Sequence, residues 1–204
     1  VSASQVEIQS GIQFYDGITT AEIQEILIRS ASDLISLDNP NYQYVAARLL
    51  LYSLRKSLYG RLWELPHLMD HIQDCIKKDV YDADVLVKYC EEEIEVLNDV
   101  IDHDRDFLFT YAGLRQVADK YLVQDRSSGK VFETPQFMYL LIAMTIFADY
   151  PKKTRLDYVT RYYQAISKHR INIPTPIMGG VRTPLRQFAS CVLVDADDTL
   201  DSIF

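Results

Sequence analysis

The run from Phe137 to Ala148, FMYLLIAMTIFA, is the longest apolar stretch of the sequence. It is about a dozen residues long, whereas a helix that crosses a membrane needs roughly 18 or more apolar residues. Pro135 stands just before it, and proline is tolerated in the first turn of a helix, where its missing N–H has no partner to lose. The stretch therefore predicts a helix buried at the centre of a mainly α fold.

Helical patterns flank this run on both sides. A possible capping box, Thr19-x-x-Glu22, opens a helix whose apolar residues recur every three or four positions. A second helix runs from Tyr42 to a basic last turn and Gly60, as helix ends prefer. Three or so amphipathic helices are expected between Leu65 and Ala118. After the buried run, one more helix carries on one face Leu156, Val159, Tyr163 and Ile166.

Two places predict β structure. The runs Tyr121 to Asp125 and Lys130 to Glu133 flank a Ser-Ser-Gly turn and predict a β-hairpin. Beyond residue 170 the sequence has three prolines, two adjacent glycines and one β-branched apolar run, Phe188 to Val194, which predicts a strand. We therefore expect the helical region to lead into the first strand of an α/β barrel or sheet, where functional groups commonly lie at strand ends.

Composition limits the class of protein. The 204 residues suffice for one large domain or two small ones, and 48% hydrophobic with 25% charged residues is ordinary for a globular protein. A formal net charge of −8 disfavours non-specific binding to nucleic acid or to an anionic membrane. Cys75, Cys90 and Cys191 are an odd number of cysteines without a recognisable signal peptide, which favours a reducing cytoplasm over a disulfide scaffold. A first residue Val1 and an acidic, still periodic ending predict a piece of a longer protein.

Two acidic segments admit more than one interpretation. Residues 99–106, DVIDHDRD, have four carboxylates and His103, a ligand set that suits a metal ion. On a helix, however, consecutive side chains point in different directions, so Asp99 is brought together with Asp102 or His103 alone. A solvated acidic helix surface is the favoured reading, and the same holds for residues 90–95, CEEEIE.

The segment after residue 170 has further candidates. Gly179 and Gly180, together with Arg182 and Arg186, could cradle a phosphate through backbone amides and guanidinium groups. Thr175 lies between two prolines, which predicts an extended, stiff backbone that could aim its hydroxyl at a ligand. A proline-rich domain crossing explains the same composition equally well. Taken by itself, Cys191 is better explained as a buried, inert thiol than as a reactive one.

Residues 173–203, IPTPIMGGVRTPLRQFASCVLVDADDTLDSI, closely resemble the segment that enters the catalytic barrel of the large (alpha) subunit of class I ribonucleotide reductase. The likeness continues along the chain: residues 5–36, 40–56 and 59–64 resemble the helical part of the family's ATP-cone. Residues 101–123 and 133–144 resemble its helical N-terminal domain. The resemblance implies a C-terminal helical part of the cone without its β-cap over 1–60, the helical domain with its hairpin over 61–170, and the start of the barrel over 171–204.

The family reduces ribonucleoside diphosphates to 2′-deoxyribonucleoside diphosphates, the precursors of DNA, by thiyl-radical chemistry. A cysteine pair supplies two electrons and becomes a disulfide, and Cys191 in FASCVL matches the first of this pair. Thr175 and Ser190 match residues that hold the substrate's diphosphate and ribose through hydroxyl and N–H donors. The radical cysteine and the second redox cysteine match no position here, so the chain is expected to be inactive alone.

The resemblance also implies allosteric control by nucleotides. Asp198, Thr199 and Leu200 match the start of the specificity site, where a deoxynucleotide or ATP binds at the dimer interface. In the cone, Thr20 and Lys56 match contacts to the effector ATP or dATP. Two departures bear on inhibition by dATP: a glutamine at position 24, where bacterial relatives commonly have histidine, and the missing β-cap.

The implied partners follow from the family. They are the ribonucleoside diphosphate substrate, a radical-generating small (beta) subunit with a metal centre, a second alpha subunit, and thioredoxin or glutaredoxin as reductant. No covalently bound cofactor, no metal bound by this chain, no nucleic acid and no membrane are expected. The alternative is a non-catalytic helical module for nucleotide sensing or subunit assembly.

Overall fold

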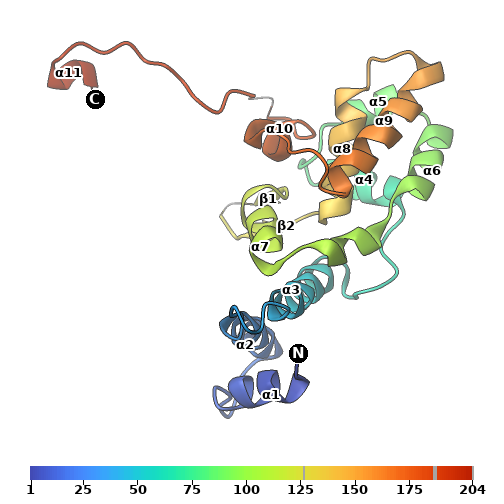
Figure 1. Cartoon of the computed structure of the whole chain (residues 1–204). Helices are drawn as coiled ribbons and strands as arrows, with labels where there is room; N and C mark the ends of the chain where they lie inside the picture. The colour runs from blue at the N-terminus through green and yellow to red at the C-terminus, as the bar shows by residue number, and fades with distance from the viewer. Residues whose placement is uncertain (126, 186–187, 204) are drawn as a thin grey trace.

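A computed structural model describes residues 1–125, 127–185 and 188–203. The fold is mainly helical with one small two-stranded antiparallel sheet (Figure 1). The helices are α1 (Ala3–Gly11), α2 (Thr20–Asp33), α3 (Tyr42–Tyr59), α4 (Leu68–Lys77), α5 (Asp84–Lys88), α6 (Glu91–Val100), the 3₁₀ helix η1 (His103–Leu108), α7 (Tyr111–Lys120), α8 (Pro135–Ile146), α9 (Lys152–Ser167), α10 (Thr175–Gly180) and α11 (Leu200–Ile203), and the strands are β1 (Gln124–Asp125) and β2 (Lys130–Val131).

Helix α8 is the centre of the core, as its apolar sequence predicts. Pro135 lies in its first turn, and every residue from there to Met144 is buried. Helix α9, η1 and α10 pack around it. The predicted face of α9 is confirmed at Val159, Tyr163 and Ile166, all buried. A helix that is apolar on all sides needs such neighbours on all sides to remove it from water.

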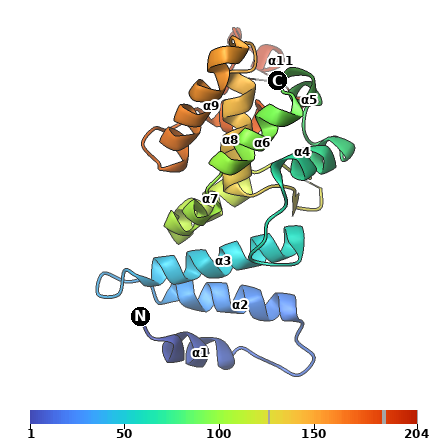
Figure 2. The ribbon, with the colours of Figure 1, turned by 90° about the vertical axis from the view of Figure 1, so that its right-hand side faces the viewer.

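Helices α1, α2 and α3 form a layer at one end of the molecule (Figure 2). The predicted capping box is present, because the Thr19 hydroxyl accepts from the backbone N–H of Glu22 and the Glu22 carboxylate accepts from that of Thr19. The predicted end of α3 is also confirmed: Gly60 has a φ of 72°, a left-handed conformation that glycine adopts without a steric cost. Helix α1 was not predicted from the helical periodicity.

The predicted hairpin forms in a shorter version. Gln124 pairs with Val131 and Asp125 with Lys130, so the paired strands are two residues each. The Asp125 carboxylate accepts from the hydroxyls of Ser127 and Ser128, and these hydrogen bonds lower its pKa to about 2. The side chains of the turn therefore supply much of the local order.

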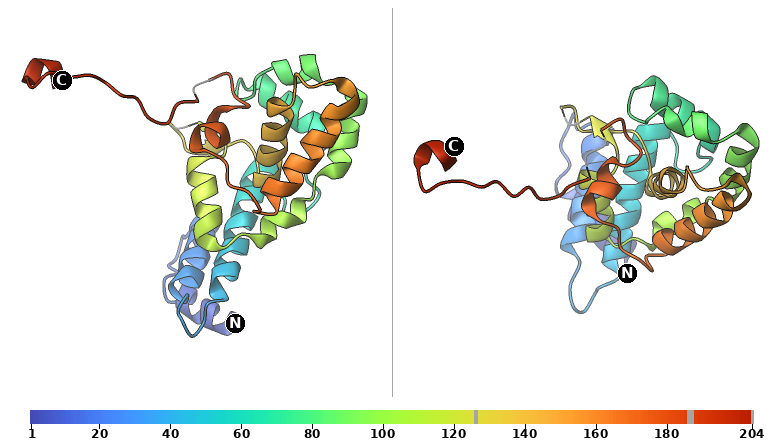
Figure 3. Two further views of the ribbon diagram at one scale, coloured as in Figure 1. Left: turned by 45° about the horizontal axis from the view of Figure 1, so that its top comes forward. Right: turned by 90° about the horizontal axis from the view of Figure 1, so that it is seen from above.

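The strand predicted over residues 188–194 is not formed. These residues are exposed and lack regular secondary structure, and in both views of Figure 3 the chain leads away from the helices toward α11. A strand is stabilised by hydrogen bonds to a neighbouring strand, and none of the described residues supplies one. Within the same described ranges, no helix is long and apolar enough to cross a membrane.

Candidate functional site

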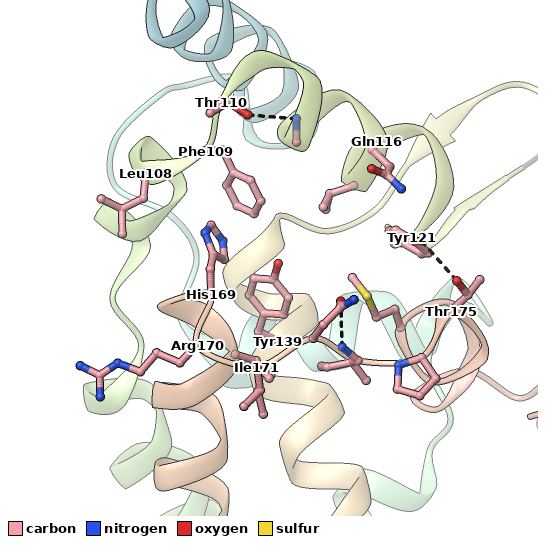
Figure 4. Close-up of a pocket in the computed structure, with 17 residues that line it drawn as sticks. Leu108, Phe109, Thr110, Gln116, Tyr121, Tyr139, His169, Arg170, Ile171 and Thr175 are labelled. Carbon is pink, nitrogen blue, oxygen red and sulfur yellow. Dashed lines mark hydrogen bonds between the residues drawn. The ribbon is translucent and has the colours of Figure 1, made fainter.

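The candidate site is a cleft of about 810 Å³ between α7, α8 and the segment that joins α9 to α10. Figure 4 shows its wall: Phe109 and Gln116 come from the α7 side, Tyr139 from α8, and His169 from the connecting segment. Thr175, at the start of α10, completes the wall beside Tyr121. The cleft thus contains a residue that the sequence assigned to substrate binding.

Thr175 does not have the extended backbone that its flanking prolines predicted. It is the first residue of α10, with Pro174 as the N-cap and Pro176 in the first turn. Prolines suit this place because the first N–H groups of a helix have no intrahelical partner. The Thr175 hydroxyl still faces the cleft, where it is hydrogen-bonded at 3.3 Å to the hydroxyl of Tyr121.

Three ionisable side chains in the wall have shifted pKa values. Burial raises the pKa of Tyr139. The hydrogen bond from Thr175 lowers the pKa of Tyr121, and the charge of the neighbouring Lys120 acts in the same direction. Burial lowers the pKa of His169, whose ring lies 4.7 Å from that of Phe109. The lowered pKa favours the neutral imidazole, and the guanidinium of Arg170 lines the cleft together with hydroxyl and amide groups (Figure 4).

A buried ion pair lies next to the cleft. Arg182 and Glu133 are both buried, and the Arg182 Nε atom donates to the two Glu133 carboxylate oxygens at 3.1 and 2.9 Å. Burial alone lowers the pKa of Arg182, but the charge and hydrogen bonds of Glu133 outweigh it and raise the pKa. Glu133 also accepts from Tyr81 and from the backbone N–H of Val123. The phosphate-binding role considered for Arg182 is therefore wrong, because its guanidinium is enclosed and already paired.

The phosphate-binding hypothesis also involved Gly179, Gly180 and Arg186. Gly179 and Gly180 belong to α10, so they form no glycine loop around an anion. Arg186 lies outside the described residues.

The acidic segment at residues 99–106 is solvated, as favoured, at Asp99, Asp102 and Asp104, but not at Asp106. Helix α6 ends at Val100, and η1 turns Asp106 into the core. There Asp106 pairs with Arg55 of α3 at 2.8 Å and accepts from Gln136 of α8 at 3.0 Å. Burial raises the pKa of Asp106, and the charge of Arg55 opposes that shift. Among the described residues no group of His, Cys, Asp and Glu side chains could hold a metal ion.

The segment at residues 90–95 is partly solvated. Glu91 and Glu92 are exposed, as expected. Glu93, however, pairs with the buried Arg155 of α9, whose Nε lies 2.7 Å from the carboxylate. The Arg155 hydrogen bond lowers the pKa of Glu93. This pair joins α6 to α9.

The two residues that the resemblance matched to effector contacts, Thr20 and Lys56, lie at the same end of the layer. Thr20 is the first residue of α2 and Lys56 lies in the last turn of α3, and these ends are adjacent in Figure 2. Both side chains are exposed. Gln24 donates to the backbone oxygen of Leu49 at 3.0 Å, which ties α2 to α3 on this side.

The remaining predicted site residues are not brought to the cleft. Cys191 is exposed, so the prediction of a buried, inert thiol is wrong. The Sγ atom of Cys191 lies 3.7 Å from the hydroxyl oxygen of Ser190. Asp198, Thr199 and Leu200 lie at the start of α11, all exposed, where the Thr199 hydroxyl accepts from a backbone N–H. Figure 1 shows that this segment leads away from α10. The sequence did not single out Tyr121, because its only signal was a place in the predicted hairpin.

Comparisons with known proteins agree on one family. The family model described as "Ribonucleotide reductase, all-alpha domain" matches residues 107–186. The whole chain is similar to the ribonucleoside-diphosphate reductase 1 subunit alpha of Escherichia coli, with 53% identity over 203 residues, and to the alpha subunit of Haemophilus influenzae, with 52%. The alpha subunit of Enterobacteria phage T4 is 47% identical over 204 residues. The chain covers 26% of the E. coli protein and 27% of each of the other two, about a quarter of their length.

Proposed function

The chain belongs to the family of ribonucleoside-diphosphate reductase alpha subunits and corresponds to their N-terminal portion, and we propose that it performs this portion's part in reducing ribonucleoside diphosphates to 2′-deoxyribonucleoside diphosphates. The observation that carries the proposal is the identity of about one half along the entire chain, which includes the cleft and the segment with Cys191. In the cell this reaction supplies precursors for DNA synthesis.

We assign Cys191 as the first cysteine of the redox pair. During turnover the substrate loses its 2′ hydroxyl as water, and two thiols of the subunit give up two electrons and two protons as they join in a disulfide. The exposed Sγ of Cys191 is free of any disulfide, which suits a thiol that has to reach a substrate and a second cysteine. A cysteine thiyl radical would start this sequence by taking the 3′ hydrogen of the substrate, and a small subunit with a metal centre would generate that thiyl radical.

In this proposal, hydroxyl side chains bind the polar groups of the substrate. Thr175 would donate to the diphosphate, and Ser190, beside Cys191, to the diphosphate or ribose. A hydroxyl has one O–H donor and two acceptor lone pairs, so it can serve both an anionic oxygen and a sugar hydroxyl. Thr175 lies in the wall of the cleft with its hydroxyl exposed, which supports the assignment.

Allosteric nucleotides would bind at two further places. Thr20 and Lys56 form part of an activity site for ATP or dATP, where the threonine offers a hydroxyl and the lysine a positive charge. Asp198, Thr199 and Leu200 form part of a specificity site for deoxynucleotide effectors, where the carboxylate of Asp198 would accept from a ribose hydroxyl. In the proposed domain division, residues 1–60 are the helical part of an ATP-cone, 61–170 the helical domain, and 171–204 the entry to the catalytic barrel.

The partners proposed are the small beta subunit, a second alpha subunit, and thioredoxin or glutaredoxin to reduce the disulfide. The compartment proposed is the cytoplasm, because Cys75, Cys90 and Cys191 are all free thiols and thiols stay reduced there.

The test is an activity assay of a full-length alpha subunit that contains this chain, with its small subunit, a dithiol reductant and CDP or another ribonucleoside diphosphate. We expect deoxyribonucleoside diphosphate to form, and we expect none from residues 1–204 alone under the same conditions. A full-length subunit that binds nucleotides but reduces no diphosphate would instead favour a sensing or assembly role.

A further inference from the structure

Two polar groups that neither the sequence nor the family resemblance assigned lie near Thr175, the hydroxyl of Tyr121 and the ammonium of Lys120. The guanidinium of Arg182 binds the backbone oxygen of Tyr121 from the buried side. The Tyr121 and Thr175 hydroxyls line the cleft of Figure 4 and also a neighbouring cleft of about 720 Å³ that Lys120 enters. The hydroxyl pair therefore faces two open spaces, and substrate could reach it from either.

The pair has an unused hydrogen-bond donor. The two oxygens lie 3.3 Å apart and either can donate to the other. Each hydroxyl has one hydrogen, so one of the two O–H groups is engaged between Tyr121 and Thr175 and the other remains available. When one hydroxyl donates to a second that donates onward, each bond polarises the next and strengthens it. A ligand oxygen at this place would receive a stronger hydrogen bond than from Thr175 alone.

The surroundings of the pair favour negative charge. The Lys120 ammonium lies 5.5 Å from the centre of the Tyr121 ring, and both it and Thr175 lower the pKa of the Tyr121 hydroxyl. Groups that stabilise a phenolate oxygen would stabilise an anionic oxygen of a ligand in the same position. The one carboxylate in the walls of the two clefts belongs to Asp79, among the residues that the structure describes.

Arg182 fixes how the two hydroxyls face each other. Its Nη2 atom donates to the backbone oxygen of Tyr121 at 2.9 Å, and its Nη1 atom donates to the backbone oxygen of Met178 in α10. Thr175 lies one turn before Met178 on the same helix. A single guanidinium therefore joins the end of α7 to α10, and Glu133 holds that guanidinium in place from its other edge.

We propose that Tyr121 is a second hydroxyl of the diphosphate site, paired with Thr175, and that Arg182 is a positioning residue that holds the two hydroxyls together. The inference rests on the proposed function, because it takes a ribonucleoside diphosphate as the ligand of Thr175. It adds Tyr121 as a residue that contacts the phosphate or strengthens the contact of Thr175, and it gives the buried Arg182–Glu133 pair a role beyond stability.

The test uses a full-length alpha subunit with its small subunit, and measures kcat and KM for CDP and the Kd of CDP by calorimetry. Tyr121→Phe keeps the ring and removes the hydroxyl, so KM and Kd should rise about 3- to 10-fold, the effect of one hydrogen bond, while kcat changes less than about twofold. Thr175→Val should raise KM as well. The double variant should lose less binding free energy for CDP than the two single variants lose in sum, since the hydroxyls act together.

Two further variants serve as control and as a test of positioning. Tyr158→Phe removes a hydroxyl from the exposed aromatic cluster on α9, away from both clefts, and should leave KM and Kd unchanged. Arg182→Lys keeps a positive charge for Glu133, but the lysine cannot reach the backbone oxygens of both Tyr121 and Met178. KM should therefore rise at a temperature at which thermal melting shows the variant to be folded. A change in melting temperature without a change in KM would assign Arg182 to stability alone and overturn its positioning role.

The outcomes separate this inference from the proposed function. If Thr175→Val raises KM and Tyr121→Phe leaves KM and Kd at the wild-type values, the role of Tyr121 is wrong and the function stands. If both variants match wild type in an active enzyme, the diphosphate is bound elsewhere and the inference fails. If the wild-type enzyme reduces no diphosphate, the proposed function fails, and calorimetry with CDP still decides whether Tyr121 contributes to binding.

Discussion

The helical body, residues 68–183, and the C-terminal segment, residues 188–203, differ in what surrounds their polar side chains. In the body, Arg155 and Arg182 are buried, and each is paired with a carboxylate. In the C-terminal segment, Ser190 and Cys191 are exposed. Polar residues of the body are thus tied to the fold, whereas those of the segment with the proposed redox cysteine are not. Substitutions in the two regions should therefore separate stability from activity.

The largest expected effect is on activity, at Cys191. In the full-length subunit, Cys191→Ser leaves a hydroxyl that cannot form the disulfide, so multiple turnover with a dithiol reductant should fall to background. Because the side chain is exposed in this chain, the free energy of unfolding of residues 1–204 should change by less than about 0.5 kcal/mol. Turnover assays and urea unfolding measure the two quantities. A folded Cys191→Ser enzyme with near wild-type turnover would contradict the redox assignment.

The opposite pattern is expected at Arg182. Arg182→Met leaves the Glu133 carboxylate buried without its partner, and breaking a buried ion pair in this way costs about 3–5 kcal/mol of unfolding free energy. Lys78→Met is the matched control, because Lys78 pairs with Asp74 on the surface and such pairs contribute about 0–1 kcal/mol. Urea unfolding of both variants of residues 1–204 measures the difference. Equal losses in the two variants would show that burial does not separate these ion pairs.

The pH dependence of stability is the next effect in size. Burial lowers the pKa of His71 to about 3 and that of His103 to about 4, whereas an unfolded histidine has a pKa of about 6.5. Between pH 6.5 and 4 the unfolded chain binds more protons than the folded chain, so stability falls as the pH falls. From pH 6.5 to 5 each histidine should remove roughly 1–2 kcal/mol of unfolding free energy. His103→Phe should make the dependence shallower, and a stability that stays flat across this range would contradict the burial of both imidazoles.

The helical part of the chain also shows where prediction from sequence succeeds. The apolar run of α8, the capping box at Thr19 and the glycine at position 60 were predicted correctly, because each is specified by neighbours within a few residues. The ion pairs were not. Arg55 and Asp106 are 51 residues apart, and Glu133 and Arg182 are 49 apart, so no local pattern connects them. For that reason Asp106 was interpreted as a solvated carboxylate and Arg182 as a ligand for phosphate.

The candidate site divides in the same way. Motif resemblance assigned roles to Thr175 and Cys191 one residue at a time, because such matching uses the sequence alone; both roles remain proposals. It could not find Tyr121, because the contact with Thr175 joins residues 54 positions apart. The strand expected over residues 188–194 failed for a related reason. Its composition favours extended backbone, but strand formation depends on hydrogen bonds to a partner strand.

The smallest effect is expected at the N-cap of α2, and it tests whether the α1–α3 layer behaves like the body. Thr19→Ala removes the hydroxyl that accepts from the Glu22 N–H at 3.2 Å, and the loss of such a cap costs about 0.5–2 kcal/mol. Thr19→Ser keeps a hydroxyl and is the matched control, with an expected change of a few tenths of a kcal/mol.

If the layer unfolds together with the body, urea unfolding of residues 1–204 should remain one transition and shift as a whole. Arg55 of α3 supports this result, because it binds Asp106 and the backbone oxygen of His103 in the body. An early transition in Thr19→Ala, with a second one at the wild-type position, would instead show that the layer unfolds by itself and that the Arg55 contacts do not couple it to the core.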